Sequence, residues 1–351
     1  MKHIIPISKE IEKILADSIQ SFSETLHEIE GQIEHSKLEY IHDSNTQTKV
    51  VVAVHDNTLG KAVNLIQIKK YENDLIAKQE ALLESRRATY KAAINNLPYG
   101  GGSTIIIDNQ DKELNNNQTH KIKDIISSNK KSIHIPTSAA PKSLHKVIDE
   151  IPNLIHKNEN KLCPKQCHAF GFLESIKASA FYLWGREDFQ HKSILIDGIT
   201  PETTALLFFL KKTKAKIFVS DNDKYKIELL KSSFDSLSFI TKEERIKFNV
   251  DIYIPTDNSL LHSHFASLLP YKIIAPSCYI NSQSEQEISK TLEKNNILLI
   301  PDFLINSAEF IYYCLQSDPN FHAKIQQKLD DLYLKTLEIF FYSKHINLPL
   351  N

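Results

Sequence analysis

Apolar and polar residues alternate along this chain in two rhythms, one typical of buried strands and one typical of amphipathic helices. Short runs rich in β-branched residues predict strands at Lys49–Val54, Thr104–Asp108, Ser132–Ile135, Ser193–Asp197, Lys216–Ser220, Asp251–Ile254, Lys272–Ala275 and Ile297–Ile300. Helical spacing predicts helices near residues 8–30, 73–97, 143–157, 166–183, 284–294, 304–316 and 320–342, with Asn73 or Asp74 as the cap of the second. The alternation of strands and helices indicates an α/β fold.

The order of these elements predicts two domains with a cleft between them. An α/β domain at residues 1–160 precedes a helix that connects it to a second domain at 161–320. Residues 193–223 read as strand, turn, helix, strand and acid, which is the βαβ pattern of a Rossmann-like, dinucleotide-binding-type domain. The tail at 321–351 predicts a long amphipathic helix.

Composition excludes several classes of protein. The chain has 351 residues and a formal net charge of −1, which argues against a general nucleic-acid binder. It has no apolar run of membrane-spanning length, and its first residues become charged too soon for a signal peptide. Four cysteines are too few for a disulfide scaffold, so we expect a cytoplasmic protein with free thiols.

The stretch TYKAAINNLPYGGGSTIIID, which begins at Thr89, carries the strongest motif. Three adjacent glycines, Gly100, Gly101 and Gly102, predict a turn in which the backbone can approach a ligand closely. The stretch resembles the amino-acid dehydrogenases of the glutamate/leucine/phenylalanine/valine family. The resemblance implies that Lys91 matches the lysine that holds the substrate carboxylate, and that Ser103 stands where a second lysine performs the chemistry.

The resemblance extends to two further parts of the substrate pocket. A family aspartate that shuttles protons falls at Ser138 or Ala139, so neither proton-transfer group is retained. Asn306 matches an asparagine near the substrate, in a first domain that resembles the family's substrate and oligomerisation domain. Glycine pairs that shape the family pocket are replaced by KAVNLIQI after Gly60 and by Ala308 and Glu309, so we expect bulkier pocket walls.

Two of these positions have plainer interpretations. Lys91 could be a solvated helix lysine, because most lysines are exposed. Ser103 could merely begin a strand and hydrogen-bond its turn, because a serine hydroxyl is neutral and needs a separate base to react.

The cofactor fingerprint of six residues that begins at Gly198 is degenerate. Of its three glycines only Gly198 remains, since Thr200 and Thr203 occupy the other two positions. Pro201 lacks an N–H group, and Glu202 puts negative charge where a pyrophosphate would bind. Asp221 matches the acid that would bond an adenosine ribose. We therefore expect no bound cofactor, although the family resemblance implies NAD(P).

Three other charged or thiol-containing segments carry no predicted site. CPKQCH, from Cys163, lacks a second ligand pair, so we expect no metal. The segment from Lys242 to Arg245 mixes both signs of charge and reads as a solvated face. Asp330 and Asp331 are neighbours on one helix and point in different directions.

These patterns leave three functions open. The first is a diverged family member without the family reaction, NAD(P)-dependent oxidative deamination of an L-amino acid, that binds an amino-acid-like or keto-acid-like ligand in the old cleft. The second is a working oxidoreductase with displaced catalytic groups. The third is a structural partner of an intact paralogue. In each case we expect a homo-oligomer whose tail helix packs on the first domain or on a neighbouring subunit.

Overall fold

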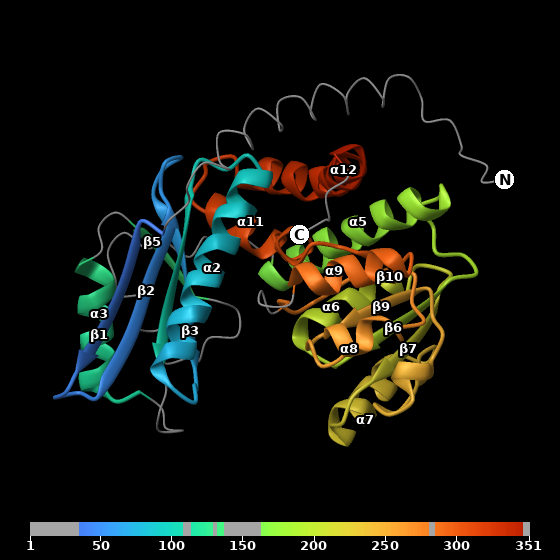
Figure 1. The fold of residues 1–351 in the computed structure, drawn as a ribbon, viewed down its shortest axis with the longest axis horizontal. Coiled ribbons are helices and arrows are strands. Elements are labelled where there is room, and N and C mark those ends of the chain that lie inside the picture. Colours follow the sequence, from blue (N-terminus) through green and yellow to red (C-terminus); the bar gives the residue numbers. More distant parts are fainter. Residues whose placement is uncertain (1–34, 108–113, 129–131, 137–162, 281–284, 347–351) are drawn as a thin grey trace. The chain divides into compact units, whose positions relative to one another are not determined.

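The computed structural model describes residues 35–107, 114–128, 132–136, 163–280 and 285–346. These residues form two compact units, each with its own β-sheet (Figure 1). The N-terminal unit holds the first sheet and residues 310–325, and the Rossmann unit holds the second sheet within residues 165–309 together with the chain from residue 326.

The N-terminal unit is built on a mixed sheet of five strands in the order β1-β2-β4-β3-β5. The strands are β1 (Lys37–Asp43), β2 (Thr48–Asp56), β3 (Ala62–Lys69), β4 (Gly100–Ile107) and β5 (Ser132–Pro136). β1 and β2 form an antiparallel hairpin, β2 pairs antiparallel with β4, and β3 is parallel to both β4 and β5. The sequence analysis missed β1 and β3.

One helix covers each face of this sheet. α2 (Asp74–Ile94) begins as predicted at Asn73, whose side chain accepts a hydrogen bond from the backbone of Ile76. Small residues of α2, including Ala77 and Ala81, pack on β2 and β4. α3 (Asn116–Ser128) packs its three buried isoleucines on the opposite face of the sheet.

The glycine run lies in a strand, and the prediction of a turn was wrong. Gly100, Gly101 and Gly102 are the first three residues of β4 and pair with β3, so Ser103 lies inside the strand. A Cβ at Gly101 would stand 2.1 Å from the backbone nitrogen of Thr89 and 2.4 Å from the carbonyl oxygen of Ser85. Glycine at this position therefore permits the close packing of β4 on α2.

The Rossmann unit contains a six-stranded, fully parallel sheet in the order β11-β10-β9-β6-β7-β8. The strands are β6 (Ser193–Asp197), β7 (Lys216–Ser220), β8 (Ser238–Phe239), β9 (Ile252–Pro255), β10 (Ile273–Ile274) and β11 (Leu298–Leu299). Counted from β6, this is the 3-2-1-4-5-6 order of a Rossmann sheet. The predicted fold class is confirmed, and the strand order changes direction between β6 and β9.

Helices connect these strands and pack around the sheet (Figure 1). Their bounds are α5 (Pro164–Trp184), α6 (Pro201–Leu210), α7 (Lys224–Ser233), α8 (Ser263–Ala266), α9 (Glu285–Lys294) and α10 (Asp302–Ile305), with a short 3-10 turn at Arg245–Lys247. Most of α11 (Ala308–Leu315) and the start of α12 (Phe321–Ile346) belong to the N-terminal unit, and α12 from residue 326 belongs to the Rossmann unit. The predicted single helix at 304–316 is instead α10 and α11, separated at Asn306 and Ser307. Within the Rossmann unit α12 packs closely on α5. A Cβ added at Gly171 of α5 would stand only 2.6 Å from the Leu332 side chain of α12.

Some predictions fall outside the described residues. These are the helices predicted near residues 8–30 and 143–157, together with Ser138 and Ala139. The domain boundaries and the packing of the tail on the first domain or on a neighbouring subunit stay predictions.

Candidate functional site

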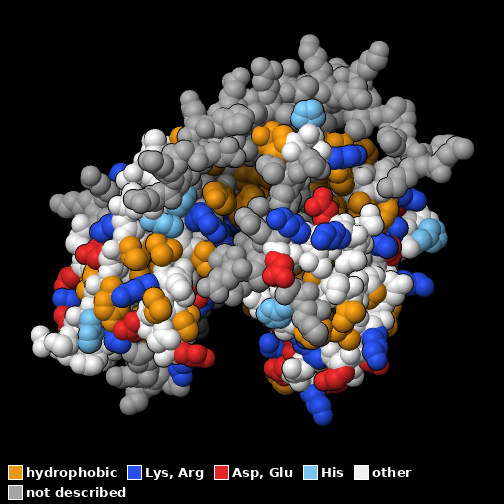
Figure 2. All heavy atoms as spheres, in the orientation of Figure 1, with side chains coloured by type: hydrophobic (Ala, Val, Ile, Leu, Met, Phe, Trp, Pro, Cys, Tyr) orange, Lys and Arg blue, Asp and Glu red, His pale blue; other side chains and the backbone are white. Residues whose placement is uncertain are grey.

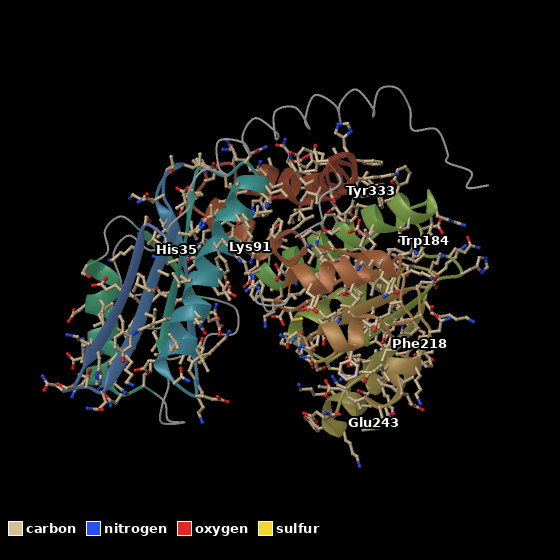
Figure 3. All side chains as sticks on the ribbon, viewed as in Figure 1. His35, Lys91, Trp184, Phe218, Glu243 and Tyr333 are labelled. Carbon is tan, nitrogen blue, oxygen red and sulfur yellow. The ribbon has the colours of Figure 1, made fainter. Side chains whose placement is uncertain are left out.

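Lys91 is a buried residue in the last turn of α2 (Figure 3). It is only 2% exposed, so the interpretation as a solvated lysine was wrong. Glu84 and Arg87 lie on the same helix face, two turns and one turn before it respectively, and are also buried. Arg87 donates to the Glu84 carboxylate at 3.0 Å. Burial raises the pKa of Glu84, and the charges of Arg87 and Lys91 oppose that rise.

Ser103 faces the same helix as Gly101. Side chains alternate along a strand, and Ile105 and Ile107 of β4 belong to the core cluster that includes Ala77 and Ala81 of α2. Ser103 is fully buried, and its hydroxyl has no hydrogen-bond partner among the residues that the structure describes. The interpretation that Ser103 begins the strand and bonds its turn was therefore wrong. The Ser103 hydroxyl is therefore a buried polar group whose hydrogen-bonding capacity is unused.

A histidine from β2 lies on the same face of the sheet. His55 occupies a bulge between the paired residues Val54 and Asp56, and its Nδ1 lies 3.0 Å from the Thr89 hydroxyl. Its ring lies edge-on to that of His35, with centroids 4.8 Å apart. Burial, with the charge of His35 as a smaller cause, lowers the pKa of His55 to about 4. His55 is therefore a neutral group at pH 7.

The shifted pKa of His55 predicts a loss of stability in mild acid. Between about pH 6.5 and pH 4 the unfolded chain binds a proton at His55 that the folded protein does not bind. The free energy of unfolding should fall as pH falls through this window, by up to about 1.4 kcal/mol per pH unit. Urea unfolding of wild type and of His55→Gln across these pH values checks this. If the variant keeps the full slope, His55 is not its source.

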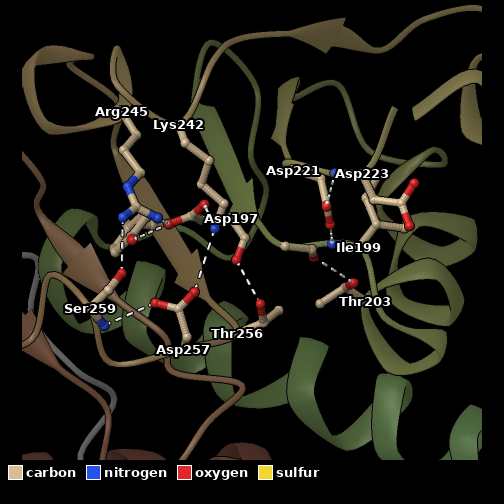
Figure 4. A network of polar contacts seen from close by, with 12 residues as sticks. Asp197, Ile199, Thr203, Asp221, Asp223, Lys242, Arg245, Thr256, Asp257 and Ser259 are labelled. Atoms are coloured by element: carbon tan, nitrogen blue, oxygen red, sulfur yellow. Dashed lines mark hydrogen bonds and ion pairs between the residues drawn. The ribbon is translucent and has the colours of Figure 1, made fainter. Parts of the chain in front are cut away.

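In the Rossmann unit, the turn between β6 and α6 uses its backbone donors internally (Figure 4). The N–H of Ile199 donates to Asp221 Oδ2 at 2.6 Å, and the N–H of Thr200 donates to Thr203 Oγ1 at 2.9 Å. The N–H of Thr203 donates in turn to Thr200 Oγ1 at 3.2 Å, which completes a capping box. Pro201, at the first position of α6, has no N–H group.

Asp221, the candidate ribose-binding acid, already accepts hydrogen bonds from the chain's own backbone. Besides accepting from Ile199, Asp221 accepts from the backbone of Asp223 through Oδ1 at 2.8 Å. Lys226 reaches from α7 to the carbonyl oxygen of Ile199 at 3.1 Å and lines a shallow hollow beside the turn, together with Thr200, Pro201 and Thr204.

These residues do not fit a dinucleotide pyrophosphate. Such a group binds to free backbone N–H groups at a helix N-terminus. Here the N–H groups of Thr200 and Thr203 already donate within the turn, and that of Ile199 donates to Asp221. Each carboxylate oxygen of Asp221 already accepts a backbone hydrogen bond. Gly198 keeps a positive φ of 116°, but a Cβ there would meet Thr256 Oγ1 at 1.8 Å, so close packing also explains this glycine.

A buried ionic network lies beside this turn, and the sequence analysis missed it. Asp197, the last residue of β6, is fully buried. Its carboxylate lies 2.6 Å from Arg245 Nη1 and 2.8 Å from Lys242 Nζ, and it accepts a hydrogen bond from the Tyr253 hydroxyl at 2.6 Å. The interpretation of residues 242–245 as a solvated face was wrong for Lys242 and Arg245, because both cations neutralise a buried acid. The available signal in the sequence was an aspartate at the end of a buried, β-branched strand, because a buried carboxylate needs a cationic partner.

Asn306 serves a structural role within the Rossmann unit. It follows the last residue of α10, and its amide nitrogen donates to the carbonyl oxygens of Pro276 and Asp302, both at 3.0 Å. These bonds stabilise the break between α10 and α11. Ala308, which stands where the family has the first glycine of a pocket-shaping pair, is fully buried.

The described residues contain no group of side chains arranged to hold a metal ion. No helix among them is long and apolar enough to cross a membrane. Lysine, arginine and acidic side chains are interspersed over the face in Figure 2, without one large field of a single sign.

Comparisons with known proteins give a consistent result, although no protein-family model matches the chain. The chain is 27% identical to L-tryptophan dehydrogenase of Nostoc punctiforme over 93% of both sequences. It is 22% identical to leucine dehydrogenase of Thermoactinomyces intermedius over 90% of this chain and 87% of the relative. The crystal structure of the Nostoc punctiforme enzyme superposes with a TM-score of 0.73 and covers 93% of this chain and 94% of its own.

A more distant structure agrees in fold alone. The hetero-hexameric glutamate dehydrogenase from Thermus thermophilus is 13% identical, with a TM-score of 0.68 over 100% of this chain and 94% of its own. Fold and comparisons together define an α/β amino-acid dehydrogenase architecture with a Rossmann-type sheet. The relatives are L-tryptophan, leucine and phenylalanine dehydrogenases, so the chain is similar over most of its length to the Glu/Leu/Phe/Val amino-acid dehydrogenase family.

Proposed function

We propose that this protein is a diverged member of the family that no longer performs NAD(P)-dependent deamination. It binds an amino-acid-like or keto-acid-like ligand beside Lys91 and the glycine run. The observation that carries the proposal is Ser103, at the position of the family's catalytic lysine. Its neutral side chain is fully buried and has no hydrogen-bond partner within the described part of the chain. A ligand group at this position would supply the partner that the hydroxyl lacks.

Proton transfer is the step that this pocket lacks. The family lysine activates the water that attacks an imine, and an aspartate beside it shuttles protons. Ser103 cannot replace that lysine without a base, and neither Ser138 nor Ala139 replaces the acid. Lys91 remains suited to holding an anionic group, because a buried cation forms a strong charge-assisted hydrogen bond.

Cofactor binding is the second loss in the proposal. The donors at Ile199, Thr200 and Thr203 would have to leave their internal acceptors before they could bind phosphate. We expect calorimetric titration with NAD(H) and NADP(H) to give at most weak binding. A micromolar dissociation constant for either cofactor would overturn this part of the proposal.

Turnover gives the sharpest test. Each proton-transfer group contributes about 10²–10⁴-fold to such a reaction, so wild type should show no cofactor reduction with leucine, valine, phenylalanine, tryptophan or glutamate. Ser103→Lys should remain inactive, because the acid and the cofactor turn are still absent. Steady turnover by wild type that is lost in Lys91→Ala would show that the family reaction survives.

One observation favours an alternative, an active amino-acid oxidoreductase with displaced catalytic groups. The match to L-tryptophan dehydrogenase spans 93% of both chains, so no large part of the dehydrogenase framework is missing. The turnover experiment separates the two functions. Self-association and a cytoplasmic location remain part of our proposal. Among the described strands β1 lies at the edge of its sheet, with Leu38 46% exposed, and offers one surface for a second copy.

A further inference from the structure

Three connections at the carboxyl edge of the second sheet meet at one buried carboxylate, Asp197 (Figure 4). Asp197 ends β6 immediately before the turn at Gly198. Lys242 and Arg245 belong to the crossover segment, residues 240–247, which leads from β8 towards β9. Thr256, which follows β9, donates to the carbonyl oxygen of Asp197 through both its N–H, at 3.0 Å, and its hydroxyl, at 2.9 Å.

Each cation of this network has a second partner beyond Asp197. Arg245 donates to the Ser259 hydroxyl at 2.9 Å, and Lys242 lies 3.5 Å from Asp257. The carbonyl oxygen of Arg245 accepts from the Tyr271 hydroxyl at 2.7 Å, and the rings of Tyr271 and Tyr253 stack with centroids 4.3 Å apart. Burial and the Asp197 carboxylate raise the pKa of Tyr253, so its hydroxyl remains a donor.

The network lies at the carboxyl ends of β6 and β9. In a Rossmann sheet, ligands bind outside the carboxyl ends of the strands, where the strand order changes direction. Here that point lies between β6 and β9. Asp197 ends the first of these strands, and Thr256, Asp257 and Ser259 follow the second. The chain's own ion pairs therefore join the loops that border this edge of the sheet.

We infer that this network fixes the crossover segment in the absence of any nucleotide. In a cofactor-dependent protein, a bound ligand stabilises the folded state that it contacts. In this chain the loops at this edge are joined instead by Asp197 and its partners. Displacing the crossover segment would separate a buried carboxylate from two cations, which is strongly unfavourable. The inference concerns the order of this segment and does not depend on the loss of deamination.

Hydrogen exchange tests the inference directly, because several amides of the segment are hydrogen-bonded. Ile240 donates to the carbonyl oxygen of Val219, and Thr241 donates to the Glu244 carboxylate. In wild type without nucleotide, a peptide covering residues 240–248 should exchange slowly, and millimolar NAD⁺ or ADP-ribose should not change its rate. Asp197→Asn should raise that rate at least tenfold and Tyr253→Phe by less, while Asp257→Asn should leave it nearly unchanged.

The outcomes separate this inference from the proposed function. Rapid exchange of the crossover segment without nucleotide, or an unchanged rate in both Asp197→Asn and Tyr253→Phe, would overturn the inference and leave the proposed function intact. Protection by NAD⁺ at residues 198–203 alone, with the crossover segment already slow, would contradict cofactor loss and support the inference. Protection of the crossover segment only after NAD⁺ is added would overturn both.

Discussion

Asp197→Asn should lower the free energy of unfolding by about 3–5 kcal/mol. The substitution preserves the shape of the side chain but removes the charge that Lys242 and Arg245 neutralise. Their side chains are only 15% and 13% exposed, so water compensates little for the lost partner. Chemical denaturation followed by fluorescence or circular dichroism would measure the change.

A matched control uses the second acid in contact with Lys242. The side chain of Asp257 is 49% exposed and lies 3.5 Å from that lysine. Because exposed ion pairs contribute little, Asp257→Asn should cost no more than about 1 kcal/mol. Equal losses for the two variants would mean that the burial of Asp197 does not decide its contribution.

Gly101→Ala should destabilise the protein by about 3 kcal/mol, which is at the upper end for overpacking a core. The added Cβ would lie 2.1 Å from the backbone nitrogen of Thr89, and a helix backbone cannot move aside as a side chain can. α2 would have to shift away from β4, together with the buried Lys91. Urea unfolding should therefore show a reduced midpoint.

The adjacent glycine supplies the comparison for this variant. A Cβ at Gly102 would first meet Asn64 Oδ1, at 1.7 Å, and that amide can rotate. Gly102→Ala should therefore cost clearly less than Gly101→Ala, about 1 kcal/mol. If Gly102→Ala proves the more damaging of the pair, close packing on α2 is not the reason for the glycine run.

Burial on both faces explains which strands could be read from the sequence. β6 and β7 were predicted with their observed bounds, because continuous β-branched runs are typical of parallel strands covered on both sides. β3 was missed, since Asn64 and Gln67 interrupt its apolar run although both are buried. The glycine run was predicted as a turn because its packing against Thr89 and Ser85 depends on tertiary contacts.

Among the candidate site residues, those in local motifs could be identified from the sequence, but their tertiary partners could not. The local motif identified Lys91, and the spacing of Gly198 and Asp221 identified the turn that corresponds to the family's cofactor turn. Sequence could not show that Asp221 accepts from Ile199, or that Lys242 and Arg245 reach back to Asp197 across nearly 50 residues of chain. Such partners are set by the strand order, which no short motif encodes.

The capping box at the start of α6 makes the degenerate fingerprint difficult to reverse by single mutations. Thr200 and Thr203 occupy two former glycine positions, and each hydroxyl now accepts a backbone hydrogen bond from the turn. A glycine at Thr203 removes one side of this cap, a hydrogen bond with a typical contribution of about 1 kcal/mol, while Pro201 still withholds a donor from phosphate. Single substitutions towards the glycine pattern would therefore lower stability before they freed donors for a phosphate. Under the proposed function, the cap favours keeping the present turn over a stepwise return to a glycine-rich one.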